Sequence, residues 1–325
     1  MKWNIKMMIL LLLMSSIMVL SSTNWMSMWI GMEINMISFV PIMKMNNKES
    51  SSSTMIYFMA QSMGSSLFLY SLLSMWFQSP SSHSSMVMMM TMASMMIKMG
   101  LPPMHMWMII VMNNLPWTSC FILMTWQKIA PLVVASKLTQ LINETFIIAM
   151  MASIIGAIGG INQTSVRKIM AYSSVSHMGW MLSLSTNNSK WIMYLFLYTM
   201  ITAILCYMFY SESIFYLNQL NLMETTNKMA LTINMLSMGG MPPMIGFLPK
   251  WMAIQMMINN NLIIIASVMI MTSLLTLMFY INMIMPMMSL GTSINKTSMI
   301  LEKNYSWMII ISTMTPLALT LNILI

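Results

Sequence analysis

Charge is what this sequence lacks most. Only 6% of its 325 residues are charged, and the acidic residues are six glutamates, since the chain contains no aspartate. Ordinary soluble domains carry about 25% charged residues. Because 58% of the residues are hydrophobic, the composition predicts an integral membrane protein. One bilayer crossing takes roughly 20 apolar residues, so this length allows about a dozen spans and no sizeable soluble domain.

Cysteine is almost as scarce. Cys120 and Cys206 both lie in apolar segments and show no CxxC or Cys/His spacing, which argues against iron–sulfur, haem or zinc binding. The sequence also lacks a GxGxxG motif after a strand and an acidic metal cluster. We therefore expect this chain to bind no NADH, FMN or metal itself.

Methionine, in contrast, is abundant, with 55 residues, far more than its use as a tolerant apolar filler requires. Many animal mitochondria read the AUA codon as methionine, so an AT-rich organellar genome would raise the count. The methionine content therefore indicates a mitochondrial origin and says nothing about mechanism.

Apolar stretches separated by polar residues predict an all-α polytopic membrane protein with about eleven transmembrane helices, with boundaries uncertain by about four residues. The basic start MKWNIK continues into a full span, which favours a span over a cleaved signal peptide. The expected spans are 4–21, 25–44, 54–77, 86–111, 117–141, 145–161, 168–186, 190–211, 229–258, 261–286 and 305–324.

The loop cations predict the orientation. With eleven spans, one face receives Lys190 alone, and the other receives most of the positive charge. The positive-inside rule then places the N-terminus on the positive side. The net charge of +8 is thus mainly a topology signal with some affinity for anionic lipid, and we expect no nucleic-acid partner. The cations of the positive face are Lys2, Lys6, Lys44, Lys48, Arg167, Lys168, Lys228, Lys296 and Lys303.

Five charged residues remain inside the expected spans: Glu33, Lys98, Lys128, Lys137 and Lys250. Each costs about 2.5 to 3.5 kcal/mol at a helix centre, so they must be paired, hydrated or functional. Lys98 and Lys128 lie about 17 to 18 Å along their helices, near the membrane midplane. Lys137 is close enough to a helix end for its ammonium to reach the interface.

Glu33 and Lys98 are expected to form an ion pair within the membrane. The pair could simply fasten two helices, but a second buried lysine without a second buried acid argues against that interpretation. Burial disfavours the charged form of a lysine and a neighbouring carboxylate favours it, so a series of buried lysines can gain and lose protons. We therefore favour a proton relay over structural pairing.

Two similar motifs interrupt long apolar spans. Residues 100–104 read GLPPM and residues 240–244 read GMPPM, each with Lys98 or Lys250 nearby. Proline removes a backbone donor and leaves a carbonyl for water or a side chain to satisfy. Paired breaks of this kind indicate an inverted-repeat transporter with its ion path at the break. We place the first repeat at about 1–141, the second at about 145–286 and a C-terminal helix at about 305–324, in one membrane domain.

Two histidines are further candidates. His105 follows the first break, and His177 lies among serines in AYSSVSHMGW. Imidazole can transfer protons near neutral pH, but interhelical hydrogen bonding explains either residue nearly as well. His83 falls in an expected loop and has no evident role.

Five motifs, in order and spacing, resemble the subunit 2 family of mitochondrial NADH:ubiquinone oxidoreductase, respiratory complex I, in a form similar to that of arthropods. They are WIGMEIN at 29–35, KMGLPPMHMW at 98–107, TWQKIAP at 125–131, INQTSVRKIMAYSSVSHMGW at 161–180 and GGMPPMIGFLPKW at 239–251. The resemblance implies an antiporter-like subunit of the membrane arm, with the family's fourteen-helix pattern reduced by its first three helices. It implies the mitochondrial inner membrane, with the N-terminus in the matrix and the C-terminus in the intermembrane space.

The same resemblance implies residue roles. Glu33 corresponds to the glutamate of the first half-channel, Lys98 to its partner on the broken helix, Lys128 to the central lysine and Lys250 to the terminal lysine. His105 and His177 are candidate additional relay groups. Lysine in GFLPKW favours subunit 2 over subunit 4, where glutamate can occupy that position.

The implied function is proton translocation, driven by electron transfer in other subunits. The chain would then be part of a proton-translocating NADH:ubiquinone reductase, whose NADH, FMN, iron–sulfur clusters and ubiquinone are bound elsewhere. The implied partners are other membrane-arm subunits, including subunits 4 and 4L, and lipids such as cardiolipin. Two alternatives stay open: a freestanding secondary cation/proton antiporter, and a structural spacer whose charges only hold helices together.

Overall fold

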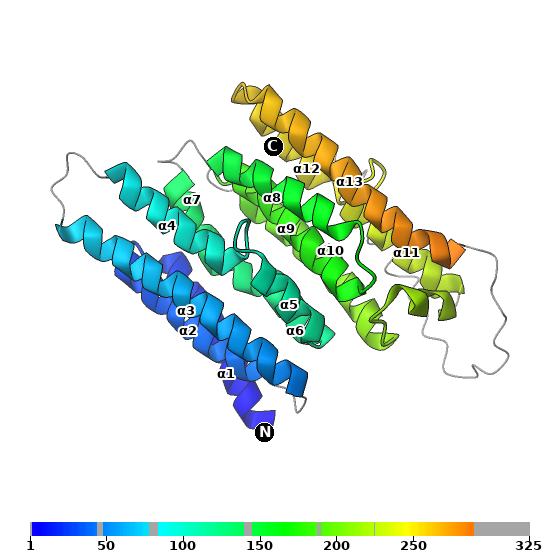
Figure 1. The fold of residues 1–325 in the computed structure, drawn as a ribbon, viewed down its shortest axis with the longest axis horizontal. Coiled ribbons are helices and arrows are strands. Elements are labelled where there is room, and N and C mark those ends of the chain that lie inside the picture. Colours follow the sequence, from blue (N-terminus) through cyan, green and yellow to red (C-terminus); the bar gives the residue numbers. More distant parts are fainter. Residues whose placement is uncertain are drawn as a thin grey trace. The chain divides into compact units, whose positions relative to one another are not determined.

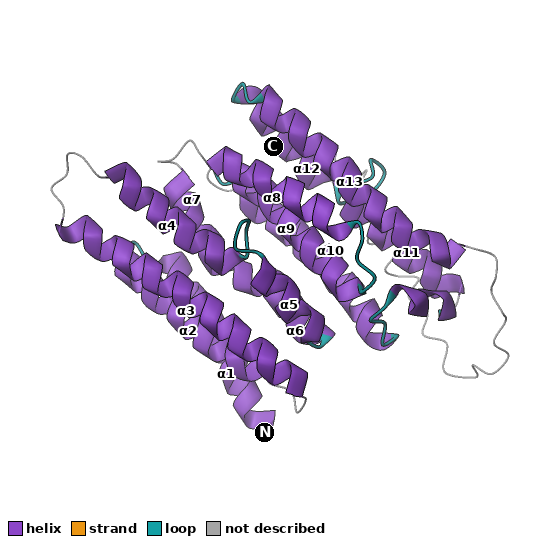
Figure 2. Ribbon diagram, viewed as in Figure 1, coloured by secondary structure: helices purple, strands orange, loops and turns teal. Residues whose placement is uncertain are grey.

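The computed structural model describes residues 2–43, 48–77, 84–139, 145–186, 190–223 and 225–288. This part of the chain consists of α-helices with one 3₁₀ helix, and it contains no β-strand (Figure 2). The prediction of an all-α polytopic fold is confirmed.

The chain divides into two compact units, which are described separately. The first unit extends to Ala152 and also includes Ser185, and the second contains Ser153–Leu184 and the later helices. The helix α8 (Thr145–Gly160) contributes residues to both. The other helices of the first unit are α1 (Lys2–Ser21), α2 (Trp25–Met43), α3 (Lys48–Phe77), α4 (Ser84–Met99), α5 (Met106–Asn114), α6 (Trp117–Met124) and α7 (Trp126–Thr139).

The second unit holds the remaining elements, which again are helices in the part that the structure describes (Figure 1). Their bounds are α9 (Val166–Leu184), α10 (Lys190–Ser211), the 3₁₀ helix η1 (Leu217–Leu222), α11 (Thr225–Gly239), α12 (Phe247–Asn259) and α13 (Ile263–Met288).

Ten of the eleven expected spans coincide with a helix or a pair of helices. The spans expected at 86–111 and 229–258 are the pairs α4–α5 and α11–α12, which are divided at GLPPM and GMPPM respectively. The span at 305–324 lies outside the described residues, as do Lys44, His83, Lys296 and Lys303. The repeat boundaries remain a prediction.

Packing within the first unit brings the charged helices together. The pairs α1–α2 and α3–α4 pack along their lengths, α2 contacts α3, and α4 contacts α7 (Figure 1). Glu33, Lys98 and Lys128 lie on α2, α4 and α7 respectively. The three charges therefore stand on helices that contact one another directly or through a common neighbour.

In the second unit, α9 is the central element. Its serines and His177 give it a polar composition, yet every residue from Ile169 to Leu184 is buried. It contacts α10, α12 and α13. Because protein surrounds it, its polar side chains find hydrogen-bond partners on the protein instead of facing lipid.

Within the described residues, four helical segments are long and apolar enough to cross a membrane by length and composition. They are Trp25–Met43, Trp117–Thr139, Lys190–Ser211 and Ile263–Met287. The helices beside the two breaks are shorter, because each expected span is divided into two pieces.

Candidate functional site

The first break ends α4 with a left-handed glycine. Gly100 has a φ of +70°, a conformation that glycine adopts without steric cost. Its N–H donates to the Ile97 carbonyl at 3.2 Å, and the Leu101 N–H donates to the Met96 carbonyl at 2.9 Å. This is the Schellman pattern of a helix C-terminus, and it places Lys98 in the last turn of α4.

The second break has the same geometry. Gly240 has a φ of +79°, its N–H donates to the Ser237 carbonyl at 3.0 Å, and the Met241 N–H donates to the Leu236 carbonyl at 3.3 Å. The glycine before each Pro-Pro pair thus ends its helix in the same way. The similarity of GLPPM and GMPPM is therefore also a similarity of backbone structure.

Side chains bind the carbonyls that the first break frees. The Gln61 Nε2 donates to the Lys98 carbonyl at 3.1 Å, and the Trp107 Nε1 donates to the Ile97 carbonyl at 3.0 Å. A lysine side chain does this at the second break, where the Lys250 Nζ donates to the Gly239 carbonyl at 2.7 Å. Lys250 is buried on α12, so its charge lies at the negative end of the α11 dipole.

Glu33 and Lys98 form the expected ion pair. The Lys98 Nζ lies 3.7 Å from the Glu33 Oε1, with side-chain exposures of 2% and 21%. This distance exceeds the ~2.7–2.9 Å of a charge-assisted hydrogen bond, and the Glu33 Oε1 has no hydrogen-bond partner among the described residues. The pair is therefore held by charge attraction without a hydrogen bond between the Lys98 Nζ and the Glu33 Oε1.

Gly64 on α3 makes room for the lysine of this pair. A Cβ atom at Gly64 would lie 2.8 Å from the Lys98 Cγ and 3.3 Å from the Ser94 carbonyl oxygen. Since real Cβ atoms essentially never approach another atom this closely, α3 and α4 need glycine here for the Lys98 side chain to pass between them.

Lys98 and Lys128 both line a small cavity of about 10 Å³, which has room for about one water molecule. Lys128 is 3% exposed, so its ammonium lies inside the protein. The cavity combines two cationic side chains with neutral hydrogen-bonding groups, an arrangement that suits water between the two lysines. Its lining residues are Tyr57, Gln61, Lys98, Met99, Trp107, Met108, Leu123, Gln127 and Lys128.

Three neutral polar residues beside this cavity form a continuous chain of hydrogen bonds. The Tyr57 hydroxyl donates to the Gln127 Oε1 at 3.1 Å, and the Gln127 Nε2 donates to the Asn35 Oδ1 at 3.1 Å. The chain links α3, α7 and α2. None of the three was a predicted site residue, although Asn35 lies in the motif WIGMEIN and Gln127 in TWQKIAP.

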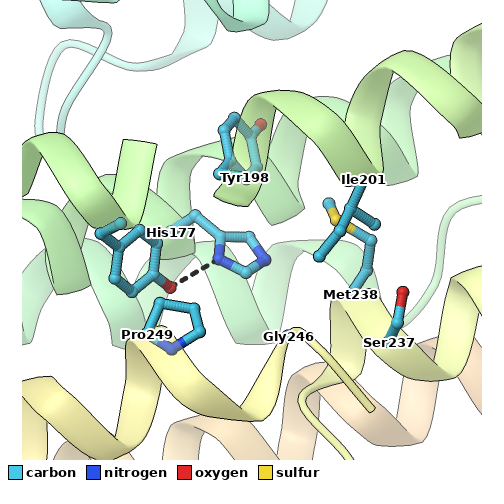
Figure 3. Close-up of a pocket in the computed structure, with 8 residues that line it drawn as sticks. His177, Tyr198, Ile201, Ser237, Met238, Gly246 and Pro249 are labelled. Carbon is cyan, nitrogen blue, oxygen red and sulfur yellow. Dashed lines mark hydrogen bonds between the residues drawn. The ribbon is translucent and has the colours of Figure 1, made fainter. Parts of the chain in front are cut away.

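His177 lines a second small cavity, also of about 10 Å³, within the second unit. Its Nδ1 is 2.8 Å from the Tyr194 hydroxyl, and Tyr198 and Pro249 also line the space (Figure 3). Pro249 directly precedes Lys250. The histidine thus has the hydrogen bond that a packing role requires and a position that suits proton transfer, so its role remains a prediction.

His105 and Lys137 occupy helix ends. His105 precedes the first residue of α5, and its Nδ1 lies 3.3 Å from the Pro103 carbonyl oxygen. The Lys137 Nζ donates to the Ser22 carbonyl at 2.9 Å, just after the end of α1. The lysine thus binds a carbonyl at a helix C-terminus, a favourable place for a cation, and it has no contact with the cavity of Lys98.

Lys228 differs from its expected position. We expected it in a loop of the positive face, but it lies in the first turn of α11 and is 6% exposed. The difference follows from α11 beginning at Thr225 instead of residue 229. Among the described residues, no group of three or more His, Cys, Asp or Glu side chains could hold a metal ion.

Helices broken at the paired GLPPM and GMPPM motifs, with buried lysines at the breaks and an acid–base pair beside a cavity, define an antiporter-like membrane protein. The family model described as "NADH:quinone oxidoreductase/Mrp antiporter, TM" matches residues 22–276. The chain belongs to this family.

Relatives of this chain carry the name NADH-ubiquinone oxidoreductase chain 2. The protein of Locusta migratoria is 39% identical over 282 residues, which cover 83% of this chain and 81% of the relative. The protein of Lumbricus terrestris is 41% identical over 287 residues, which cover 86% and 85%. The insect relative agrees with the expected arthropod form.

Solved structures share the fold. A chain of respiratory complex I from Thermus thermophilus matches with a TM-score of 0.81 at 17% identity, over 88% of this chain and 71% of that chain. A chain of the Mrp complex from Dietzia sp. matches with a TM-score of 0.75 at 15% identity, over 85% and 59%. These similarities confirm the antiporter-like architecture.

Proposed function

We propose that this chain moves protons through the membrane arm of an NADH:ubiquinone oxidoreductase by a relay of buried charges. Glu33, Lys98 and Lys128 act in the first unit and Lys250 acts in the second. The observation that carries the proposal is the cavity that Lys98 and Lys128 both line, with the Glu33–Lys98 ion pair beside it. His105 and His177 are proposed as additional relay groups.

The family and the relatives indicate the protein complex in which the relay would work. The chain is a proton-translocating membrane subunit of an NADH:ubiquinone oxidoreductase, and its partners are other subunits of that complex. Electron transfer, with NADH, FMN, iron–sulfur clusters and ubiquinone, belongs to those subunits.

In this proposal, the Glu33–Lys98 ion pair controls whether Lys128 holds its proton. While Glu33 is charged, it attracts the Lys98 ammonium and weakens the repulsion that Lys98 exerts on a charge at Lys128. Loss of this attraction leaves two like charges at one cavity, which drives a proton away from Lys128. We propose that this proton then passes to Lys250 and leaves the membrane. A change in a neighbouring subunit can drive the cycle only if the two states of the pair differ in free energy.

Finer details of the setting are also proposals. We place the chain in the mitochondrial inner membrane, with the N-terminus in the matrix and the C-terminus in the intermembrane space, because the loop cations gather on one face. Subunits 4 and 4L are the proposed neighbours, and cardiolipin is a proposed lipid because the chain is strongly cationic.

A freestanding cation/proton antiporter is the second candidate, because the family model also covers Mrp antiporters and the Mrp chain shares the fold. The two candidates use the same buried charges and differ in their dependence on partners. Exchange of cations for protons by the isolated chain in vesicles would favour the antiporter.

The test of the relay is Lys128→Met in the assembled complex, which removes the charge and keeps an apolar side chain of similar length. We expect fewer protons pumped per NADH oxidised, measured in proteoliposomes, with a normal amount of assembled complex. The matched control is Lys137→Met on the same helix, which lies outside the cavity. An unchanged proton yield in the fully assembled Lys128→Met complex would support the spacer alternative and contradict the relay.

A further inference from the structure

The backbone that carries Lys128 is loosely held by its own helix. The preceding helix α6 ends at Met124, and Thr125 interrupts the pattern with φ −115° and ψ −72°. The Lys128 N–H donates to the Thr125 carbonyl in a tighter turn, at 3.2 Å. Pro131 lies inside α7 and has no N–H for the carbonyl four residues before it, that of Gln127. Helical hydrogen bonds alone therefore fix this turn poorly.

Side-chain hydrogen bonds of Gln127 help to fix the turn that carries Lys128. Gln127, next to Lys128, donates from its Nε2 to the Asn35 Oδ1 and accepts at its Oε1 from the Tyr57 hydroxyl. Asn35 is two residues after Glu33 on α2. The amide of Gln127 thus connects the turn that carries Lys128 to the helix that carries the acid of the ion pair.

Tyr57, the hydrogen-bond partner of Gln127 on α3, is held firmly by packing. Tyr57 is 1% exposed, and its ring packs edge-on against Phe39 and Trp107, with centroids 5.3 Å and 5.9 Å apart. Trp107 in turn donates to the Ile97 carbonyl beside Lys98. Through these contacts, one chain of residues connects the positions of Glu33, Lys98 and Lys128.

We infer that Gln127 is a positioning residue of the relay. Its hydrogen bonds to Asn35 and Tyr57 hold Lys128 in a fixed position relative to the Glu33–Lys98 pair. The inference rests on the proposed function. Gln127 itself moves no proton in this account: a neutral amide with both its oxygen and its NH₂ engaged holds geometry without adding a charge to the cavity. A displacement of α2 that changes the ion pair is thereby transmitted to the turn of Lys128.

The experiment compares variants in the assembled complex by coupled NADH oxidation and by proton yield per NADH. Gln127→Asn keeps the amide but is one methylene too short to reach both partners, and Tyr57→Phe removes only the hydroxyl. We expect Tyr57→Phe to slow coupled turnover about fivefold, as for the loss of one net hydrogen bond of ~1 kcal/mol, and Gln127→Asn, which weakens two hydrogen bonds, to slow it further. The matched control is Tyr70→Phe, on the same helix but 61% exposed, which should match the unmodified complex.

A swapped pair separates positioning from packing. Asn35→Gln combined with Gln127→Asn restores the summed length of the two side chains, so an amide of α2 can again bond an amide of α7. We expect this double variant to recover coupled turnover to about the level of Tyr57→Phe, because it regains the bond between positions 35 and 127 and still lacks the bond to Tyr57.

The outcomes also separate this inference from the relay itself. If Lys128→Met abolishes the contribution of this chain to pumping while Gln127→Asn and Tyr57→Phe pump normally, the positioning role is wrong and the relay stands. A swapped pair that is no better than Gln127→Asn alone would also overturn it. If Lys128→Met pumps normally, the proposed function fails first.

Discussion

Single residues show why a charged relay can exist in so apolar a protein. The charges at Glu33, Lys98 and Lys128 could be predicted from the sequence, because any charge within a span is costly and must have a reason. The neutral residues that hold them, such as Gln127, could not, because amides and hydroxyls occur throughout the chain and only their geometry sets them apart. Gly64 was equally hidden, since its role depends on the path of the Lys98 side chain between α3 and α4.

Gly64→Ala tests that path. The added methyl group should displace the Lys98 side chain from Glu33, because its Cβ would stand 2.8 Å from the Lys98 Cγ. We expect an overpacking cost of about 1 to 3 kcal/mol, partly offset by the ~1 kcal/mol gain in helix propensity. The complex should therefore assemble yet pump fewer protons per NADH. Pumping at the unmodified yield would show that the lysine does not need this space.

At the scale of the element, the two breaks were predictable and the third interruption was not. The Pro-Pro pairs predict that the spans containing them are divided, as they are into α4–α5 and α11–α12, because proline cannot continue the helical hydrogen bonds. Pro131 signals a weakened helix near Gln127, but the sequence does not show that the interruption falls at Thr125. At the two breaks, side chains bind the backbone carbonyls directly, which is one of the two possibilities expected: the donors are Gln61, Trp107 and Lys250.

The second break depends on close backbone contact. A Cβ atom at Gly246 would overlap with the Ser237 carbonyl oxygen, and backbone cannot move aside as a flexible side chain can. We expect Gly246→Ala to destabilise the break by more than ~4 kcal/mol and to abolish assembly, measured as the amount of intact complex.

Gly239→Ala is the matched control at the same break, because its Cβ would meet neighbours no closer than 3.5 Å. It should assemble. Equal assembly of the two variants would contradict the close packing of α11 against the start of α12.

The whole molecule combines two units, each with its own break, buried lysine and cavity. Composition and periodicity predicted the spans well, because each must be long and apolar. They could not predict that the Lys250 ammonium binds the carbonyl end of α11, whereas the Lys98 ammonium faces Glu33. In the part of the chain that the structure describes, the first unit therefore has a carboxylate beside a buried lysine, which it can control.

The most direct test of the account is therefore the number of protons pumped per NADH oxidised by the assembled complex with Glu33→Gln, in proteoliposomes. The amide keeps the shape of the side chain and removes the charge that holds Lys98. The account predicts a lower proton yield and slower coupled NADH oxidation at a normal amount of complex, with Glu212→Gln in the second unit as the control at full yield. An unmodified yield and rate for Glu33→Gln would contradict a relay controlled by this ion pair.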